Sequence, residues 1–112
     1  MADLDSLTAQ TISYSTLTAD QVNEQVEALG ARWSVDGIDL KCELAGQTGM
    51  KKCGEAVAHA TALADEMDHH PSIRMEYPAT VLTIHTHDQK AITMIDIIYA
   101  ARLEGWLRAN GW

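Results

Sequence analysis

Histidine exchanges protons closest to neutral pH, and four of the five histidines in this 112-residue sequence lie within nineteen residues. His69 and His70 are adjacent and precede Pro71, whereas His85 and His87 alternate along a β-branched run. Imidazoles can donate a proton, accept one or bind a metal ion. The cluster therefore indicates a candidate site, with three interpretations.

The first two interpretations are a structural role and a metal site. Histidines at a helix end complement the helix dipole, and a histidine on a sheet face is often a solvated surface residue. Alternatively, His85 and His87 are spaced as metal ligands, and His69 or His70 could supply a third. Adjacent histidines diverge, which weakens a shared metal site. Carboxylates that could complete it are Asp65, Asp68 and Asp88.

The third interpretation is acid–base chemistry without a metal, in which one imidazole gives a proton while another takes one. Asp65 lies four residues before His69, about one helical turn away. Its carboxylate could accept a hydrogen bond from the ring and fix the tautomer. The chemistry requires a substrate with a leaving hydroxyl or an exchangeable N–H.

The first half of the chain predicts a helix followed by a β-hairpin. Thr18 and Gln21 form a capping box, and a stop at Gly30 ends the helical pattern. Alternation on both sides of Asp36-Gly37 predicts a two-residue hairpin turn. The helical face comprises Val22, Val26 and Leu29, and the buried strand face comprises Trp33, Val35, Ile38, Leu40, Cys42 and Leu44.

The second half repeats this order. Apolar residues from Cys53 to Met67 recur at helical spacing, and Pro71 should end that helix near His69. Ile73, Met75 and Tyr77 predict a third strand, Pro78-Ala79 a turn, and residues 80–87 a fourth strand. On that strand His85 and His87 share one face with Val81 and Thr83.

Thr93 and Asp96 predict the N-cap and third residue of a last helix. This helix is apolar on more than one side, with a second stripe that comprises Tyr99, Leu103, Trp106 and Leu107. We interpret that stripe as a homo-oligomer interface. The predicted class is α+β: helix, hairpin, helix, hairpin, helix, with a four-stranded antiparallel sheet and helices packed on one face.

Composition narrows the function classes. A formal net charge of -8 argues against nucleic-acid binding, and no apolar run is long enough to span a membrane. An acidic, polar N-terminus and two cysteines, Cys42 and Cys53, predict a cytoplasmic protein with free thiols. We expect residues 1–15 to form a loose arm and residues 16–112 a single domain.

The histidine region resembles the pterin-4a-carbinolamine dehydratase family. Its signature is an acidic residue, three residues, His-His-Pro, five residues, an aromatic residue, then Thr-His and an Asp nine positions later. Trp33 also matches a tryptophan common in the family. The corresponding residues are Asp65, His69-His70-Pro71, Tyr77, Thr86-His87 and Asp96, all at the signature spacing.

The resemblance implies the fold described above and a homotetramer. It also implies metal-free and cofactor-free dehydration of 4a-hydroxytetrahydropterin to quinonoid dihydropterin, with the pterin as substrate. That step, a hydro-lyase reaction, recycles the tetrahydrobiopterin used by aromatic amino-acid hydroxylases. Among relatives are also non-catalytic binding and assembly modules, which is the alternative function.

The resemblance further implies roles for individual residues. His69 and His87 would be the acid and base in an order left open, and His70 would orient the pterin. Substrate-binding residues would be Asp65, Pro71, Thr86, Asp88, Gln89 and Asp96. Asp96 has an alternative role as a helix cap only. In this chain Lys90-Ala91 replaces a usual Gly-Gly pair beside the pterin loop, and His85 is additional.

Overall fold

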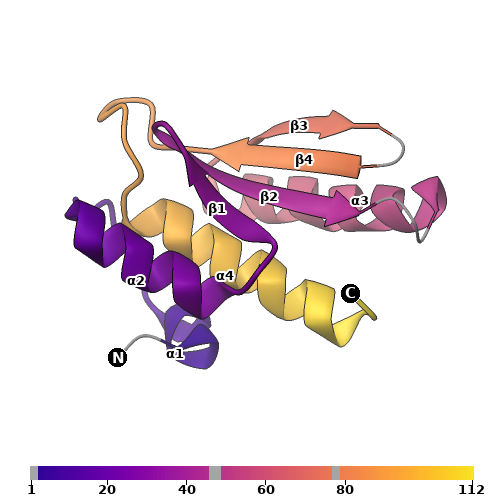
Figure 1. The fold of residues 1–112 in the computed structure, drawn as a ribbon, viewed down its shortest axis with the longest axis horizontal. Helices are drawn as coiled ribbons and strands as arrows, with labels where there is room; N and C mark the ends of the chain where they lie inside the picture. Colours follow the sequence, from indigo (N-terminus) through magenta and orange to yellow (C-terminus); the bar gives the residue numbers. More distant parts are fainter. Residues whose placement is uncertain (1–2, 46–48, 77–78) are drawn as a thin grey trace.

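The computed structural model describes residues 3–45, 49–76 and 79–112, which form one layer of helices beneath one sheet (Figure 1). Predictions that concern Tyr77 and Pro78 lie outside these residues. The elements are, in chain order, α1 (Leu4–Ala9), α2 (Ala19–Leu29), β1 (Trp33–Asp36), β2 (Asp39–Ala45), α3 (Met50–Met67), β3 (Ser72–Met75), β4 (Ala79–Ile84) and α4 (Met94–Ala109).

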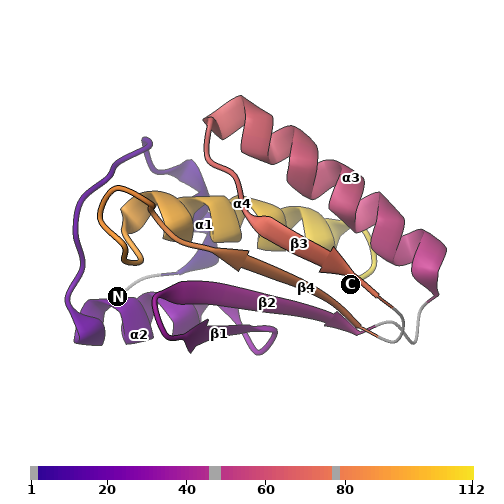
Figure 2. The same ribbon diagram turned by 90° about the horizontal axis from the view of Figure 1, so that it is seen from above.

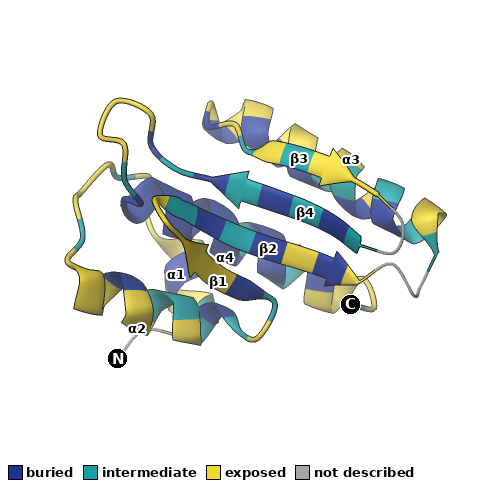
Figure 3. Cartoon of the chain, turned by 45° about the horizontal axis from the view of Figure 1, so that its top comes forward, coloured by how far each residue is buried: buried dark blue, intermediate teal, exposed yellow. Residues whose placement is uncertain are grey.

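The strands form an antiparallel sheet in the order β1-β2-β4-β3. The central pair, β2 and β4, joins the two hairpins, and the helices lie on one face of the sheet (Figures 1 and 2). The predicted α+β class and element order are therefore confirmed. One side of β4 is buried, so buried and partly buried residues alternate along this strand, dark blue and teal in Figure 3.

The N-terminal segment differs from the loose arm that we expected. Residues 4–9 form α1, with Asp3 as N-cap accepting a hydrogen bond from the Ser6 amide at 2.8 Å. Leu7 is buried in the core where α1 packs on α4. A six-residue helix has little stability of its own, so tertiary packing decides its formation.

The first hairpin turn lies one residue later than predicted. Asp36 pairs with Asp39, so the turn residues are Gly37 and Ile38 rather than Asp36 and Gly37. Gly37 takes the first turn position with φ +63°, a conformation that favours glycine. Ile38 is consequently 46% exposed in the turn, and Val35 is 43% exposed, so their predicted burial is wrong.

The last helix confirms its predicted start but not the partner inferred for its second stripe. Tyr99, Leu103 and Leu107 are buried within this chain, and Trp106 is partly buried against the same core. The helices α1, α2 and α3 all pack against α4, which therefore lies at the centre of the molecule. Its all-round apolar surface gives no independent argument for an oligomer, and the homotetramer stays a prediction from the resemblance.

Candidate functional site

The end of α3 directs the two adjacent histidines to different places. Asp68 adopts a left-handed conformation with φ 51° and ψ 46°. The amide of His69 then donates back to the Ala64 carbonyl at 3.0 Å, which closes a Schellman-type helix end. Pro71 follows, as expected for a helix stop. His69 turns inward and is 8% exposed, whereas His70 is exposed.

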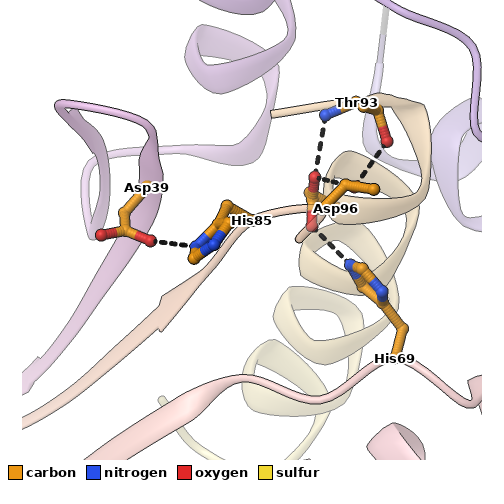
Figure 4. A network of polar contacts seen from close by, with 6 residues as sticks. Asp39, His69, His85, Thr93 and Asp96 are labelled. Atoms are coloured by element: carbon orange, nitrogen blue, oxygen red, sulfur yellow. Dashed lines mark hydrogen bonds and ion pairs between the residues drawn. The ribbon is translucent and has the colours of Figure 1, made fainter. Parts of the chain in front are cut away.

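His69 contacts the start of α4. Its Nε2 lies 2.5 Å from Oδ1 of Asp96, a carboxylate that is fully buried (Figure 4). If Nε2 donates to the ionised carboxylate, the neutral ring presents Nδ1 as its basic nitrogen. The pair therefore combines a fixed ring with a ring nitrogen that can exchange a proton.

Hydrogen bonds from β4's extension and the α4 cap fix the Asp96 carboxylate. Its Oδ2 accepts from the Thr93 amide at 2.8 Å and from the Thr86 hydroxyl at 2.9 Å. The Thr86 hydroxyl has one proton and donates it to Asp96. The Thr93 hydroxyl, 2.8 Å from the Thr86 hydroxyl, therefore donates to Thr86. Asp96 thus caps α4, as one interpretation expected, and also contacts His69.

The expected partnership of Asp65 with His69 is wrong. Asp65 Oδ1 lies 3.3 Å from Nε2 of His70, and both side chains are exposed. The left-handed residue Asp68 reverses the chain before His69, so helical spacing no longer predicts which side chain meets Asp65. Asp65 and His70 therefore form a solvated surface pair.

The second histidine pair lies where β4 ends. The strand stops at Ile84 rather than at His87, because the Thr86 amide donates to the Ala91 carbonyl at 2.9 Å and residues 87–90 form a turn. His85 and His87 nevertheless remain in contact, with ring centroids 4.5 Å apart and planes at 62°. His87 is exposed in the turn, as are Asp88 and Gln89.

Asp39 is a site residue that sequence reasoning missed. Its Oδ1 lies 2.8 Å from Nδ1 of His85 (Figure 4). Leu40 pairs with Ile84, so one further step along the ladder brings Asp39 opposite His85. No local signal could have found this contact, since it depends on the register of strands far apart in sequence.

Tyr14 is a second neighbour that the sequence did not reveal. Its ring centroid lies 6.4 Å from that of His69, with the planes at 84°. The Gln89 side chain donates to the Tyr14 carbonyl at 3.4 Å, which joins the N-terminal segment to the turn after β4. The sequence could not predict this contact, because residues 1–15 carry no clear helical or strand pattern that would place Tyr14.

Lys90 keeps a backbone shape that normally selects glycine. It adopts φ +50° at a position where the resemblance leads us to expect glycine. The turn that carries His87 therefore retains a left-handed residue despite the sequence change.

The remaining nucleophilic groups lie in the core. Burial raises the pKa of the Cys42 thiol to about 12, so it stays protonated near neutral pH. Burial also raises the pKa of Tyr99, whose hydroxyl donates to the Ala60 carbonyl at 2.7 Å. In the described part of the chain, no three His, Cys, Asp or Glu side chains are grouped as metal ligands.

Comparison with known proteins identifies the family of the chain. The family model described as pterin 4 alpha carbinolamine dehydratase matches residues 15–106, which include every histidine and carboxylate of the site. The chain belongs to the pterin-4a-carbinolamine dehydratase family. No helix among the described residues is long and apolar enough to cross a membrane.

Relatives of this dehydratase family cover most of the chain. A protein from Chromobacterium violaceum, provisionally named a pterin-4-alpha-carbinolamine dehydratase, is 30% identical over 93 residues, which are 80% of this chain and 82% of that protein. A similarly named protein from Brucella ovis is 28% identical over 87 residues, 78% of this chain and 90% of that protein.

A solved structure from the same family shares the fold. The crystal structure of a protein described as a transcriptional coactivator/pterin dehydratase from Brucella melitensis matches with a TM-score of 0.72 and 27% identity. The match covers 81% of this chain and 97% of that one. The α+β fold of this chain is thus the fold of a pterin dehydratase relative.

Proposed function

We propose that this protein catalyses dehydration of 4a-hydroxytetrahydropterin to quinonoid dihydropterin. Family membership supports the substrate class, and the observation that carries the proposal is the buried His69–Asp96 pair. Thr86 and Thr93 hold the Asp96 carboxylate, which contacts Nε2 of His69, so the ring is fixed and its Nδ1 is left to accept a proton from a substrate.

The reaction removes one proton and one hydroxyl from the substrate. In our proposal His69 Nδ1 takes the proton from N5, and the N–H electron pair forms the C4a=N5 double bond. The C4a–O bond breaks, and His87 protonates the departing hydroxyl, which leaves as water. Solvent then returns a proton to His87 and removes one from His69. Such acid–base help contributes about 10²–10⁴-fold.

The remaining residues would bind the substrate. His70 lies beside Pro71 at the exit of α3 and would orient the pterin, with Asp65 beside His70. Asp88 and Gln89, in the turn that carries His87, would form the rim. In this proposal Thr86 and Asp96 act through His69 by fixing its ring.

The decisive test is turnover of chemically generated 4a-hydroxytetrahydropterin, followed by ultraviolet absorbance. We expect the wild-type protein to accelerate dehydration over buffer. His69→Ala and His87→Ala should each lose most of that acceleration. His59→Ala is the matched control, because His59 lies on α3 and stacks on Trp106 with centroids 4.5 Å apart, away from the Asp96 network.

The alternative is a non-catalytic binding module on the same fold, which the coactivator half of the Brucella melitensis description favours for that protein. Wild-type protein that leaves the dehydration rate at the buffer value would refute the enzyme proposal and favour the binding module. Equal activity of His87→Ala and wild type would instead refute the assignment of His87 as the acid.

A further inference from the structure

The N-terminal segment, residues 3–16, lies almost entirely outside the family match but is held against the rest of the domain by hydrogen bonds. The family model begins at residue 15, whereas α1 and the chain after it precede that position. The Thr8 hydroxyl donates to the Ala101 carbonyl at 3.3 Å. Arg102 donates to the Thr8 carbonyl at 3.4 Å and to the Gln10 carbonyl at 3.2 Å. The segment therefore has a defined path along α4.

That path ends across the start of α4, beside the site. The Met94 amide donates to the Ser15 carbonyl at 3.0 Å, and Thr16 forms an antiparallel bridge with Thr93. Figure 2 shows this indigo strand of chain running beside the orange loop that follows β4. Thr93 is also the residue whose amide donates to Asp96, so the segment is attached to the carboxylate network itself.

Tyr14 occupies the point where the segment passes His69. Its ring and the His69 ring are nearly perpendicular, at 84°, so the two do not stack on each other. Tyr14 is 51% exposed, whereas His69 is 8% exposed. Much of the tyrosine ring is therefore open to a third planar group that approaches His69 from solvent.

We propose that Tyr14 is a substrate-binding residue that stacks on the planar ring system of the pterin and positions it against His69. This inference deepens the proposed function and rests on it for the ligand class. A fixed backbone at residues 14–16 lowers the entropy that stacking would otherwise cost. Every conjugated ring has a face that can stack, so the contact would serve a pterin with any side chain.

The experiment compares Tyr14→Ala, Tyr14→Phe and wild type in the dehydration assay and in equilibrium binding of 7,8-dihydrobiopterin. An aromatic contact of this kind predicts about a tenfold rise in KM and Kd for Tyr14→Ala. We expect kcat to stay within about twofold, since Tyr14 transfers no proton. Tyr14→Phe keeps the ring and should retain wild-type affinity.

Ile12→Ala is the matched control, because Ile12 is 41% exposed in the same segment. It should leave KM, Kd and the melting temperature unchanged. The melting temperature of Tyr14→Ala should also match wild type, which separates binding from folding. A Tyr14→Ala variant with unchanged KM and Kd would overturn the inference and leave the proposed reaction intact.

Three other outcomes bear on this inference or on the proposed function. Tyr14→Phe as weak as Tyr14→Ala would overturn stacking, because the ring is still present. Wild-type protein that binds dihydrobiopterin through Tyr14 but does not accelerate dehydration would support the binding role and refute the enzyme proposal. Wild-type protein that does not bind dihydrobiopterin at all would overturn this inference.

Discussion

His69 and His70 are neighbours in sequence, and each contacts an aspartate, but their surroundings are opposite. Asp96 is fully buried and accepts hydrogen bonds from Thr86 and Thr93 as well as contacting His69. Asp65 contacts His70 at 3.3 Å, with the two side chains 83% and 58% exposed. A His–Asp contact therefore describes two different things: a fixed internal pair and a solvent-exposed surface pair.

The difference teaches that anchoring, not sequence proximity, makes a pair suitable for chemistry. Water screens the Asp65–His70 attraction, and holding two free side chains together costs entropy. Asp96, in contrast, accepts hydrogen bonds from Thr86 and Thr93 that hold its carboxylate in place beside His69. Between these extremes lies Asp39–His85, whose side chains are 33% and 23% exposed. The three pairs form a graded series, which single substitutions can test.

Asp96→Asn should have the largest effect. The amide has one acceptor oxygen for three donors, so at least one of Thr86, Thr93 and His69 loses its partner. Breaking a buried charged pair typically costs about 3–5 kcal/mol, and the isosteric amide should cost about 2–3 kcal/mol. Urea unfolding followed by circular dichroism measures this. An Asp96→Asn variant with the same urea midpoint as the wild-type protein would contradict the assignment of Asp96 as the centre of the network.

Asp39→Asn should have an intermediate effect. The Asp39–His85 contact at 2.8 Å is partly screened, and its loss should cost about 1 kcal/mol in the same unfolding experiment. His85→Asn tests the contact from the other side. The two costs should not add in the double variant, since one contact is removed either way. Full additivity would show that Asp39 and His85 are energetically independent.

Asp65→Asn should leave the unfolding midpoint unchanged, because the pair with His70 is solvated. The variant is the matched control for Asp96→Asn, since both replace an aspartate that contacts a histidine by asparagine. A loss of stability as large as that of Asp96→Asn would remove the distinction drawn between the two pairs. Repeating both measurements at high salt sharpens the test, because screening acts mainly on exposed charges.

Local patterns were sufficient to predict the elements around these pairs. Capping residues, apolar periodicity and Pro71 predicted α2, α3 and α4 and the pairing into hairpins, because each signal acts within a few residues. The partners of the histidines were not local. Asp65 was chosen by helical spacing, which Asp68 interrupts with φ 51°. Asp39 meets His85 only through the β2–β4 register.

The N-terminal segment and the turn after β4 illustrate two further limits. Residues 4–9 become helical because α4 offers a surface for Leu7, which no pattern in residues 1–15 announces. Lys90 replaces an expected glycine but keeps φ +50°, so the sequence change did not predict a change in backbone shape. At the N-terminus a tertiary contact outweighs local preference, whereas after β4 the Lys90 conformation accompanies hydrogen bonds within the turn itself.

His59 extends the comparison to a histidine whose neighbour is a ring rather than a carboxylate, and we expect a small effect that depends on pH. It stacks on Trp106 at 4.5 Å with planes at 9°. Burial lowers the pKa of His59 below its ordinary 6.5, although Glu66 opposes this. The unfolded chain therefore binds a proton more readily than the folded one once the pH falls below about 6.5. His59 then costs stability as the pH falls through that range.

The check is the melting temperature of wild type and His59→Gln at pH 7.5 and pH 5.5. Other titrating groups are common to both proteins, so the difference between them isolates His59. Wild type should lose slightly more stability on acidification than the variant, by a degree or so, because the site is only partly desolvated. A larger loss for His59→Gln would reverse the sign and mean that Trp106 and Glu66 favour the protonated ring over the neutral one.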